Sequence, residues 1–378
     1  MSELITIDGN RRNLKERLLI TSSALSLVGF IALIDIANAA ENDRPTAWIE
    51  LGGQLEMLQG TSSPIVAPFM AVSPTPAPYL AVPFIDSQRP ADHAFGLEGK
   101  LTFQPKNSDW VFSASVRYGR SHAKRHLHHT NTVIVSQHTS YGTPTHPAKH
   151  NPFADSRTRS DESHAVIDFS VGRDVGLGLF GRDSTSTLNA GVRFAQFSTK
   201  SSVNASGRPS LEHYLVAPKY LFYRTSFNQY ALTGHADRNF HGIGPSVSWN
   251  ASITVLGNAE AGELALDLGA NAALLFGRQT AKVDHATKAY AKHFLPVSQY
   301  YSLYAPRNVN DLKRSRAATV PNLGGVAGIS VKYPNAKISL GYRADFFFGA
   351  VDAGIDERRT KNLGFSGPFA TISFGFGG

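Results

Sequence analysis

The stretch Leu264–Phe276, LALDLGANAALLF, decides the fold. Apolar side chains recur at alternate positions along it, and Asp267, Gly269 and Asn271 occupy the positions between them. A period of two residues is the pattern of a β-strand with two different faces. The stretch is longer than the roughly 5–6 residues of a typical soluble strand, and it meets the ~9–11 residues that a tilted strand needs to cross a bilayer. It therefore predicts a membrane-crossing strand.

Nine further segments show the same alternation. A soluble sandwich or barrel with an apolar core would give this pattern too. Two features favour a membrane barrel: charged residues together with Gly and Ser on the polar face, which suit a wet lumen, and aromatic residues near the segment ends, which suit an interfacial girdle. The nine segments lie near 49–57, 95–104, 110–118, 165–171, 188–194, 243–255, 320–333, 337–350 and 363–376. The aromatic residues are Phe95, Phe103, Trp110, Tyr118, Phe276, Tyr333 and Phe376.

The connections between the segments alternate in length. Long connections are predicted at 59–93, 121–161, 199–236, 278–319 and 351–362, and short ones at 105–109, 174–187, 257–262 and 334–336. Outer-membrane barrels have short periplasmic turns and long outer loops. In hydrocarbon, strands must also close into a sheet without edges, because every backbone N–H and C=O needs a partner. We therefore predict an all-β fold, a transmembrane antiparallel up-and-down β-barrel of about ten strands, within a range of about 8–12.

Residues 1–40 differ from the rest of the chain. A basic stretch precedes the apolar run Leu18–Ile34, and the small residues Ala37–Ala40 follow it. This is the layout of a cleaved secretory signal. A single membrane anchor is the alternative, since the apolar run is near the ~17-residue lower limit for spanning. The prediction is a signal peptide over 1–40 and a barrel over 41–378, located in the bacterial outer membrane.

Composition excludes several classes of site. The chain has 378 residues, with 37 Lys and Arg, 29 Asp and Glu, a formal charge of +8 and no Cys. Disulfide scaffolds, zinc-thiolate centres and cysteine nucleophiles are therefore excluded. Gly176–Gly181 spells G-x-G-x-x-G, but it is followed by Asp183–Thr187 and another strand rather than by a helix start, so we interpret it as a turn and predict no cofactor. The basic residues form no recognisable nucleic-acid-binding module.

Several stretches resemble the pore-forming outer-membrane proteins related to the Legionella major outer membrane protein. They are Phe240–Pro245, Leu266–Arg278, Gly367–Ile372 and above all Val320–Asp345, VPNLGGVAGISVKYPNAKISLGYRAD. The resemblance lies in the carboxy-terminal third and around the fifth to seventh segments. It implies a β-barrel with porin-like function and brings no catalytic motif. Many such barrels end in an aromatic residue, whereas this chain ends Phe376-Gly377-Gly378.

The polar faces of the segments carry charges of both signs, which we expect to line the lumen and to select solutes by size and charge. The sequence thus predicts an outer-membrane pore for passive diffusion of small hydrophilic solutes. The predicted pore-lining residues are Glu50, Glu98, Lys100, Arg117, Asp168, Arg193, Asp267, Lys332, Lys337, Arg343 and Asp345.

The connection 278–319 is strongly basic. We predict that it forms a loop at the pore mouth, where it either funnels anions towards the lumen, giving a weak anion preference, or contacts phosphates of lipopolysaccharide. A loop kept soluble by its charge is the alternative. The predicted mouth residues are Lys282, Lys288, Lys292, Arg307, Lys313, Arg314 and Arg316.

Histidines are concentrated in the second long connection. Imidazole suits Zn²⁺, Cu²⁺ and Ni²⁺, so His122, His126, His128 and His129 are weak metal candidates. Because these histidines lack helical spacing and have no thiolate or clear carboxylate cluster beside them, we favour a solvated surface and predict no metal.

Two other function classes stay open. The barrel could be a structural or adhesive surface protein that presents its long basic and His-rich loops, because charged side chains could fill a narrow lumen. A hydrolytic site near the outer rim, using His213, His235 or His241, is the weaker alternative because no G-x-S-x-G motif is present, and we predict no enzyme. The predicted partners are outer-membrane lipid, lipopolysaccharide and small hydrophilic solutes, and a homo-oligomer is compatible with the sequence.

Overall fold

The computed structural model describes residues 47–59, 93–106, 108–130, 133–135, 148–150, 153–175, 184–208, 224–258, 262–294, 300–355 and 357–376. The predicted signal peptide, the G-x-G-x-x-G stretch and His213 lie outside these ranges. No helix within them is long and apolar enough to cross a membrane. The strands are β1 (Ala47–Gln59), β2 (His93–Phe103), β3 (Trp110–Thr130), β4 (Val133–Val135), β5 (Ala148–His150), β6 (Phe153–Asp174), β7 (Ser184–Arg208), β8 (Arg224–Asn258), β9 (Gly262–Phe294), β10 (Tyr300–Tyr333), β11 (Ala336–Asp352) and β12 (Thr360–Phe376).

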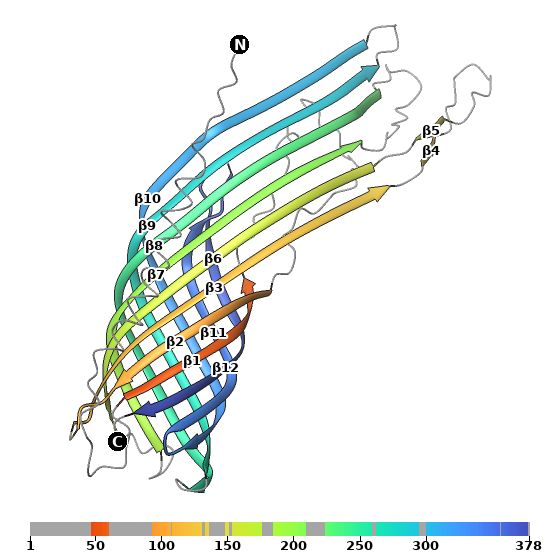
Figure 1. Ribbon diagram of the computed structural model, residues 1–378. Helices are drawn as coiled ribbons and strands as arrows, with labels where there is room; N and C mark the ends of the chain where they lie inside the picture. Colours follow the sequence, from red (N-terminus) through yellow and green to blue (C-terminus); the bar gives the residue numbers. More distant parts are fainter. Residues whose placement is uncertain are drawn as a thin grey trace, which may run out of the picture.

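Ten strands close into one barrel, as predicted. The order around it is β1-β12-β11-β10-β9-β8-β7-β6-β3-β2, and neighbouring strands are antiparallel all round the ring (Figure 1). The first and last strands complete the ring from Ala47↔Phe376 to Gln59↔Gly364. The short strands β4 and β5 form a separate two-stranded sheet, so they do not raise the strand count of the barrel.

Outward and inward faces alternate along the strands as a membrane barrel requires. On β1, Leu51 and Leu55 are exposed on the outer surface, whereas Gln54 and Glu56 are buried inside. The same contrast separates Leu340 from its neighbour Ser339 on β11, with exposures of 52% and 6%. Large apolar side chains thus face outwards all round the ring, which is the reverse of a soluble barrel.

The prediction of loops over 121–161, 199–236 and 278–319 is wrong for most of their length. β3 and β6 remain paired as far as Thr130↔Phe153, and β9 and β10 as far as Phe294↔Tyr300. β2 pairs with β3 only up to Arg120, and β11 pairs with β10 only up to Asn322. Six strands, β3 and β6 to β10, therefore continue beyond the ring as what we call the extended sheet (Figure 1). Period-two alternation weakens there because neither face of this part contacts lipid.

A charged substitution on the outer face tests this arrangement. We expect Leu340→Arg to lower the free energy of unfolding in phospholipid vesicles by about 2–4 kcal/mol, because the arginine would lie in hydrocarbon. Urea unfolding followed by tryptophan fluorescence measures the change, with Leu340→Phe as the control. If the outer surface faced water instead, an arginine at this exposed position would change stability by no more than about 0.5 kcal/mol.

Candidate functional site: the barrel lumen

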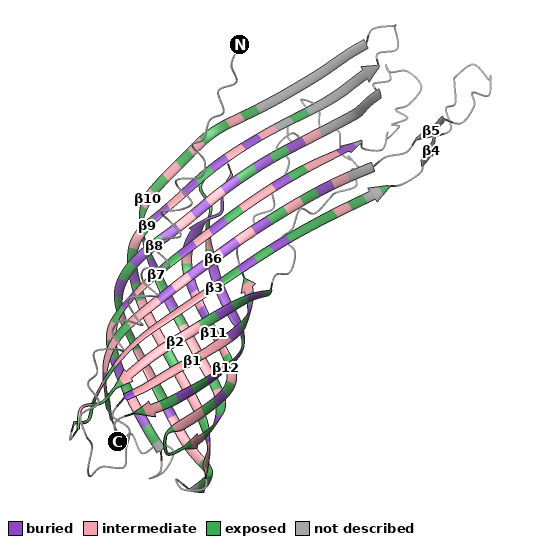
Figure 2. Ribbon diagram, viewed as in Figure 1, coloured by how far each residue is buried: buried purple, intermediate pink, exposed green. Residues whose placement is uncertain are grey.

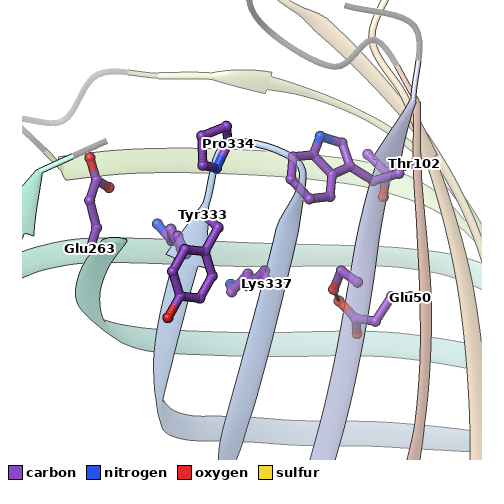
Figure 3. A pocket seen from close by; sticks show the side chains of 9 residues that line it. Glu50, Thr102, Glu263, Tyr333, Pro334 and Lys337 are labelled. Atoms are coloured by element: carbon purple, nitrogen blue, oxygen red, sulfur yellow. Dashed lines mark hydrogen bonds between the residues drawn. The ribbon is translucent and has the colours of Figure 1, made fainter. Parts of the chain in front are cut away.

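The lumen begins with a vestibule at the end where Tyr333 and Ala336 are joined by a short turn, the periplasmic end of an outer-membrane barrel. A pocket of about 350 Å³ opens there, lined by both acidic and basic side chains (Figure 3). Lys337 Nζ lies 2.7 Å from Asp267 Oδ2, and Ser373 donates a hydrogen bond to Glu50. The lining residues are Trp48, Glu50, Thr102, Glu263, Lys332, Tyr333, Pro334, Lys337 and Ser373.

Deeper in the lumen, charged and amide side chains form what we call the ionic layer. Arg193 of β7 contacts both carboxylate oxygens of Asp168 on β6, at 2.6 and 3.1 Å. The same guanidinium donates to Asn271 of β9 at 2.7 Å and to Asn322 of β10. Because Arg193 is 5% exposed, its charge depends on these partners rather than on water.

The ionic layer also bridges strands that are not neighbours. Arg117 of β3 pairs with Asp345 of β11, and Arg343 of β11 pairs with Glu98 of β2 at 2.5 Å. In the ring, β3 and β11 are separated on one side by β2, β1 and β12. These side chains therefore meet across the lumen and narrow it at the depth of the membrane.

Above the ionic layer lies an aromatic layer, composed of Phe197, Phe240, Phe347 and Phe365. The Phe197 ring stacks on Phe240 with centroids 5.7 Å apart and meets Phe347 edge-on at 4.6 Å. Each of the four rings is at most 6% exposed. Since these residues come from β7, β8, β11 and β12, they form an apolar constriction inside a lumen that is otherwise polar. Along the strands of the ring, buried residues recur between exposed and intermediate ones (Figure 2).

Beside the aromatic layer, a buried His–Glu pair completes the constriction. His164 Nε2 of β6 lies 3.3 Å from Glu56 Oε1 of β1, and the imidazole packs on Phe365 with centroids 3.9 Å apart. A Cβ at Gly119 would collide with both His164 and Glu56, so glycine leaves the space that brings them together.

The predicted mouth residues divide between the two faces of the extended sheet. Arg314 points into the upper lumen and pairs with Asp352 at 2.8 Å, and Arg316 donates to Gln279 at 3.0 Å. Lys282, Lys288 and Lys313 are instead exposed, and Lys282 pairs with Asp311. The side chains of Lys292 and Arg307 lie outside the described residues. Most of the predicted loop 278–319 therefore belongs to strands β9 and β10, which extend to Phe294 and from Tyr300. Of the predicted mouth residues whose side chains the structure describes, only Arg314 and Arg316 point inwards.

The structure places the eleven predicted pore-lining residues on the inward face, and Lys100 shares the inward parity of Glu98 on β2. That they line a conducting pore stays a prediction. Sequence reasoning missed the aromatic layer. Its only signal was the run Phe346-Phe347-Phe348, in which strict alternation forces the middle ring inwards.

The candidates for other chemistry are not gathered in the lumen. His235 and His241 are exposed residues of β8. His122 pairs with Asp161, and His126 and His128 both contact Asp155, on the outward face of β3 and β6. Within the described ranges, no group of three or more His, Cys, Asp or Glu residues could hold a metal ion.

Together the closed ring, the apolar outer face and the charged interior define an integral membrane β-barrel of the outer-membrane type. The family model described as "Legionella pneumophila major outer membrane protein precursor" matches residues 86–376. The chain belongs to this family and is located in the bacterial outer membrane. Membership of an outer-membrane barrel family points to a non-enzymatic role.

Among solved structures, the chain has remote similarities. It resembles the transport unit of the autotransporter AIDA-I from Escherichia coli, with 9% identity over 94% of this chain and 97% of that one and a TM-score of 0.25. It also resembles a mutant of the TodX monoaromatic hydrocarbon channel, with 10% identity over 87% and 90% of the two chains and a TM-score of 0.20. No match was found among curated proteins.

Removing one partner of a buried ion pair tests how much the ionic layer contributes to the stability of the barrel. We expect Asp345→Ala to cost about 3–5 kcal/mol of stability, because Arg117 would keep a buried charge without its partner. The double variant Arg117→Leu, Asp345→Ala should cost clearly less than the sum of the two single variants. Urea unfolding in vesicles measures each value.

The control is Asp109→Ala, which breaks an exposed ion pair with Arg173 and should cost at most about 1 kcal/mol. Equal costs for Asp345→Ala and Asp109→Ala would show that the ionic layer is solvated and not held by the cross-lumen pairs.

Proposed function

We propose that this barrel is a narrow, porin-like pore for passive diffusion of small hydrophilic solutes. The supporting observation is the series of inward-facing charges from Lys332 and Asp267 at the vestibule, through Arg193 and Arg343, to Arg314 above the aromatic layer. A wall of charged side chains lowers the free energy of water and ions along the path, and it selects solutes by charge.

Two constrictions limit the flow. The ionic layer consists of guanidinium–carboxylate pairs. A passing anion can bind the guanidinium of a pair, and a passing cation can bind its carboxylate. The aromatic layer presents an apolar surface that excludes water when its rings are in contact, and apolar constrictions gate channels by dewetting. Conduction therefore requires the rings of Phe197 and Phe347 to separate, and only small solutes should pass.

A weak anion preference belongs to the same proposal. The upper lumen holds Arg238, Arg314 and Arg316, and its inward-facing acidic residues include Asp352 and Glu162. A cationic entrance raises the local concentration of anions. Opposed pairs in the ionic layer cancel much of the field further down, so the preference should be small.

Planar-bilayer recordings of the purified protein test the pore. We expect small conductance steps for the wild type and a severalfold larger conductance for the double variant Phe197→Ala, Phe347→Ala, because this removes the apolar contact that closes the lumen. The matched control is Phe276→Ala, Phe348→Ala, which removes two rings from the outer face and should leave conductance unchanged. Silence in both the wild type and the Phe197→Ala, Phe347→Ala variant would exclude a pore.

Reversal potentials in a salt gradient test the charge preference separately. Arg316→Glu should shift selectivity towards cations, whereas Lys313→Glu, an equal charge change on the outer face of the same strand, should not. A wild type that prefers cations would contradict the proposed anion preference.

A second function is favoured by the extended sheet, which continues well beyond the closed ring (Figure 1). We propose as the alternative a structural or adhesive barrel that presents this basic surface outside the membrane. A lumen crossed by side chains suits that role as well. Two results together would support the alternative over the pore. The purified barrel should show no conductance in bilayers, and cells that carry it should adhere to a host surface only while the extended sheet is intact.

We also propose that residues 1–40 are a cleaved export signal, as expected from their sequence. Amino-terminal sequencing of the protein isolated from outer membranes should begin at or near Glu41. An intact amino terminus would favour the membrane anchor instead.

A further inference from the structure

The outer face of the extended sheet contains an arrangement that opposes folding. In the register of β3 and β6, Lys124 lies directly opposite Arg159, and His126 lies opposite Arg157. Like charges at directly paired positions of an antiparallel sheet are destabilising. Three cations, Lys124, Arg157 and Arg159, are therefore held together by backbone pairing in spite of their repulsion.

These residues share the outward face. On β3, Ser121 and Ala123 are buried, whereas His122 and Lys124 between and beyond them are exposed. On β6, Ser156 and Ser160 are buried, and Arg157 and Arg159 are exposed by 72% and 54% of their side-chain surface. The cations are thus open to a ligand from outside the barrel.

The cations border a groove with further hydrogen-bond donors. Its volume is about 480 Å³, and its lining includes Lys124, Arg157, Arg159, Ser202 and Asn204. In the register of β6 and β7, Arg159 is opposite Ser202 and Arg157 is opposite Asn204. Guanidinium, ammonium, hydroxyl and amide donors together form the set that binds phosphate oxygens.

The acidic residues nearby do not cancel the cluster. Asp155 accepts hydrogen bonds from His126 at 2.8 Å and His128 at 3.1 Å, and the first of these lowers the pKa of its carboxyl group. Arg157 forms only a long, exposed ion pair with Asp155, with Nε 3.9 Å from Oδ1. Asp161 accepts a hydrogen bond from Arg159 Nε at 3.0 Å and also contacts His122. The half-exposed Arg159 guanidinium therefore shares its charge with Asp161 and can still turn its terminal nitrogens, together with Lys124 and Arg157, towards an anion.

The position of the cluster selects the source of the anion. The outer face of β3 is apolar or aromatic from Trp110 to Tyr118, and Lys124 lies six residues beyond Tyr118, or about 20 Å along the strand. With the ~40° tilt of barrel strands, this places Lys124 about 15 Å above the apolar belt. The same face is continuous with the lipid-facing wall, so it is adjacent to the saccharides of outer-leaflet glycolipids.

We propose that Lys124, Arg157 and Arg159 form a binding site for a phosphate group on the saccharide of lipopolysaccharide, which bridges the opposed cations of β3 and β6. Occupation of the site ties the free edge strand β3 to β6. The proposal depends on the position of the barrel in the outer membrane and not on its conductance.

The test compares two double variants of the full barrel, folded in detergent. Lys124→Gln, Arg159→Gln removes the opposed pair, and Lys106→Gln, Arg173→Gln removes two exposed cations at the periplasmic end. Binding of purified lipopolysaccharide is measured by titration, together with the thermal unfolding midpoint with and without it. We expect the first variant to weaken binding about tenfold and the second to leave it unchanged.

A second readout separates a binding site from a merely structural cluster. Without lipopolysaccharide, Lys124→Gln should raise the unfolding midpoint because it relieves repulsion, and the increase on adding lipopolysaccharide should become smaller. Dephosphorylated lipopolysaccharide should bind to the wild type about as weakly as intact lipopolysaccharide binds to the double variant.

Three results would overturn the proposal. One is equal lipopolysaccharide binding by the wild type and the Lys124→Gln, Arg159→Gln variant. Another is undiminished binding of dephosphorylated lipopolysaccharide. The third is full competition by inorganic phosphate at millimolar concentration, which would show a site for the free anion rather than for the glycolipid.

Discussion

Backbone hydrogen bonding in hydrocarbon is the constraint on which this structure depends. A strand that leaves one row of N–H and C=O groups unpaired inside a bilayer loses several kcal/mol for each group, so the sheet has to close. The pairing of β1 with β12 provides that closure, and it joins the two ends of the barrel sequence in a continuous register. Beyond the ring, water can replace the missing partners, which is why the β3 and β10 edges of the extended sheet are tolerated outside the membrane. Charged side chains such as Lys124 on the free edge also oppose pairing with other chains.

Closure of only ten strands leaves little room inside, and the interior is organised accordingly. Buried charges are stable only when they are paired and hydrogen-bonded, so the ionic layer uses opposed pairs such as Arg193 with Asp168 and Arg343 with Glu98. The aromatic layer does not carry this cost, and it excludes water from its own level of the lumen. A narrow barrel can thus hold its shape with a filled centre, and the conduction that we propose would depend on movement of these side chains.

Much of the fold could be predicted from the sequence because both faces of the strands obey a strict chemical rule at membrane depth. Leu264–Phe276 alternates since one face meets acyl chains and the other meets the lumen, and that rule gave the number and order of the barrel strands. The same rule assigned Arg117 and Asp345 to the inner face, but alternation carries no information about which residues meet across a lumen. The pairing of these two residues therefore needed the closed ring.

The errors arose where the rule does not apply. Strands β9 and β10 continue past Arg278 and Thr319 into water, where the outward face carries charged residues such as Lys282 and Lys313 in place of apolar ones, so their sequence resembles a basic loop. Phe347 was missed because it lies between two outward-facing rings and breaks the polar pattern of the inner face. Both cases depend on the surroundings of a residue rather than on its neighbours in sequence.

The central claim is that alternate residues of each barrel strand face lipid and lumen. Because the chain contains no Cys, single cysteines can be introduced one at a time from Ile338 to Phe346 on β11 and labelled with nitroxide in vesicles. We expect high collision rates with oxygen dissolved in the bilayer at Ile338, Leu340, Tyr342, Ala344 and Phe346, and low rates at the residues between them. Uniform rates along the segment, or the opposite alternation with high rates at Ser339 and Asp345, would contradict this claim.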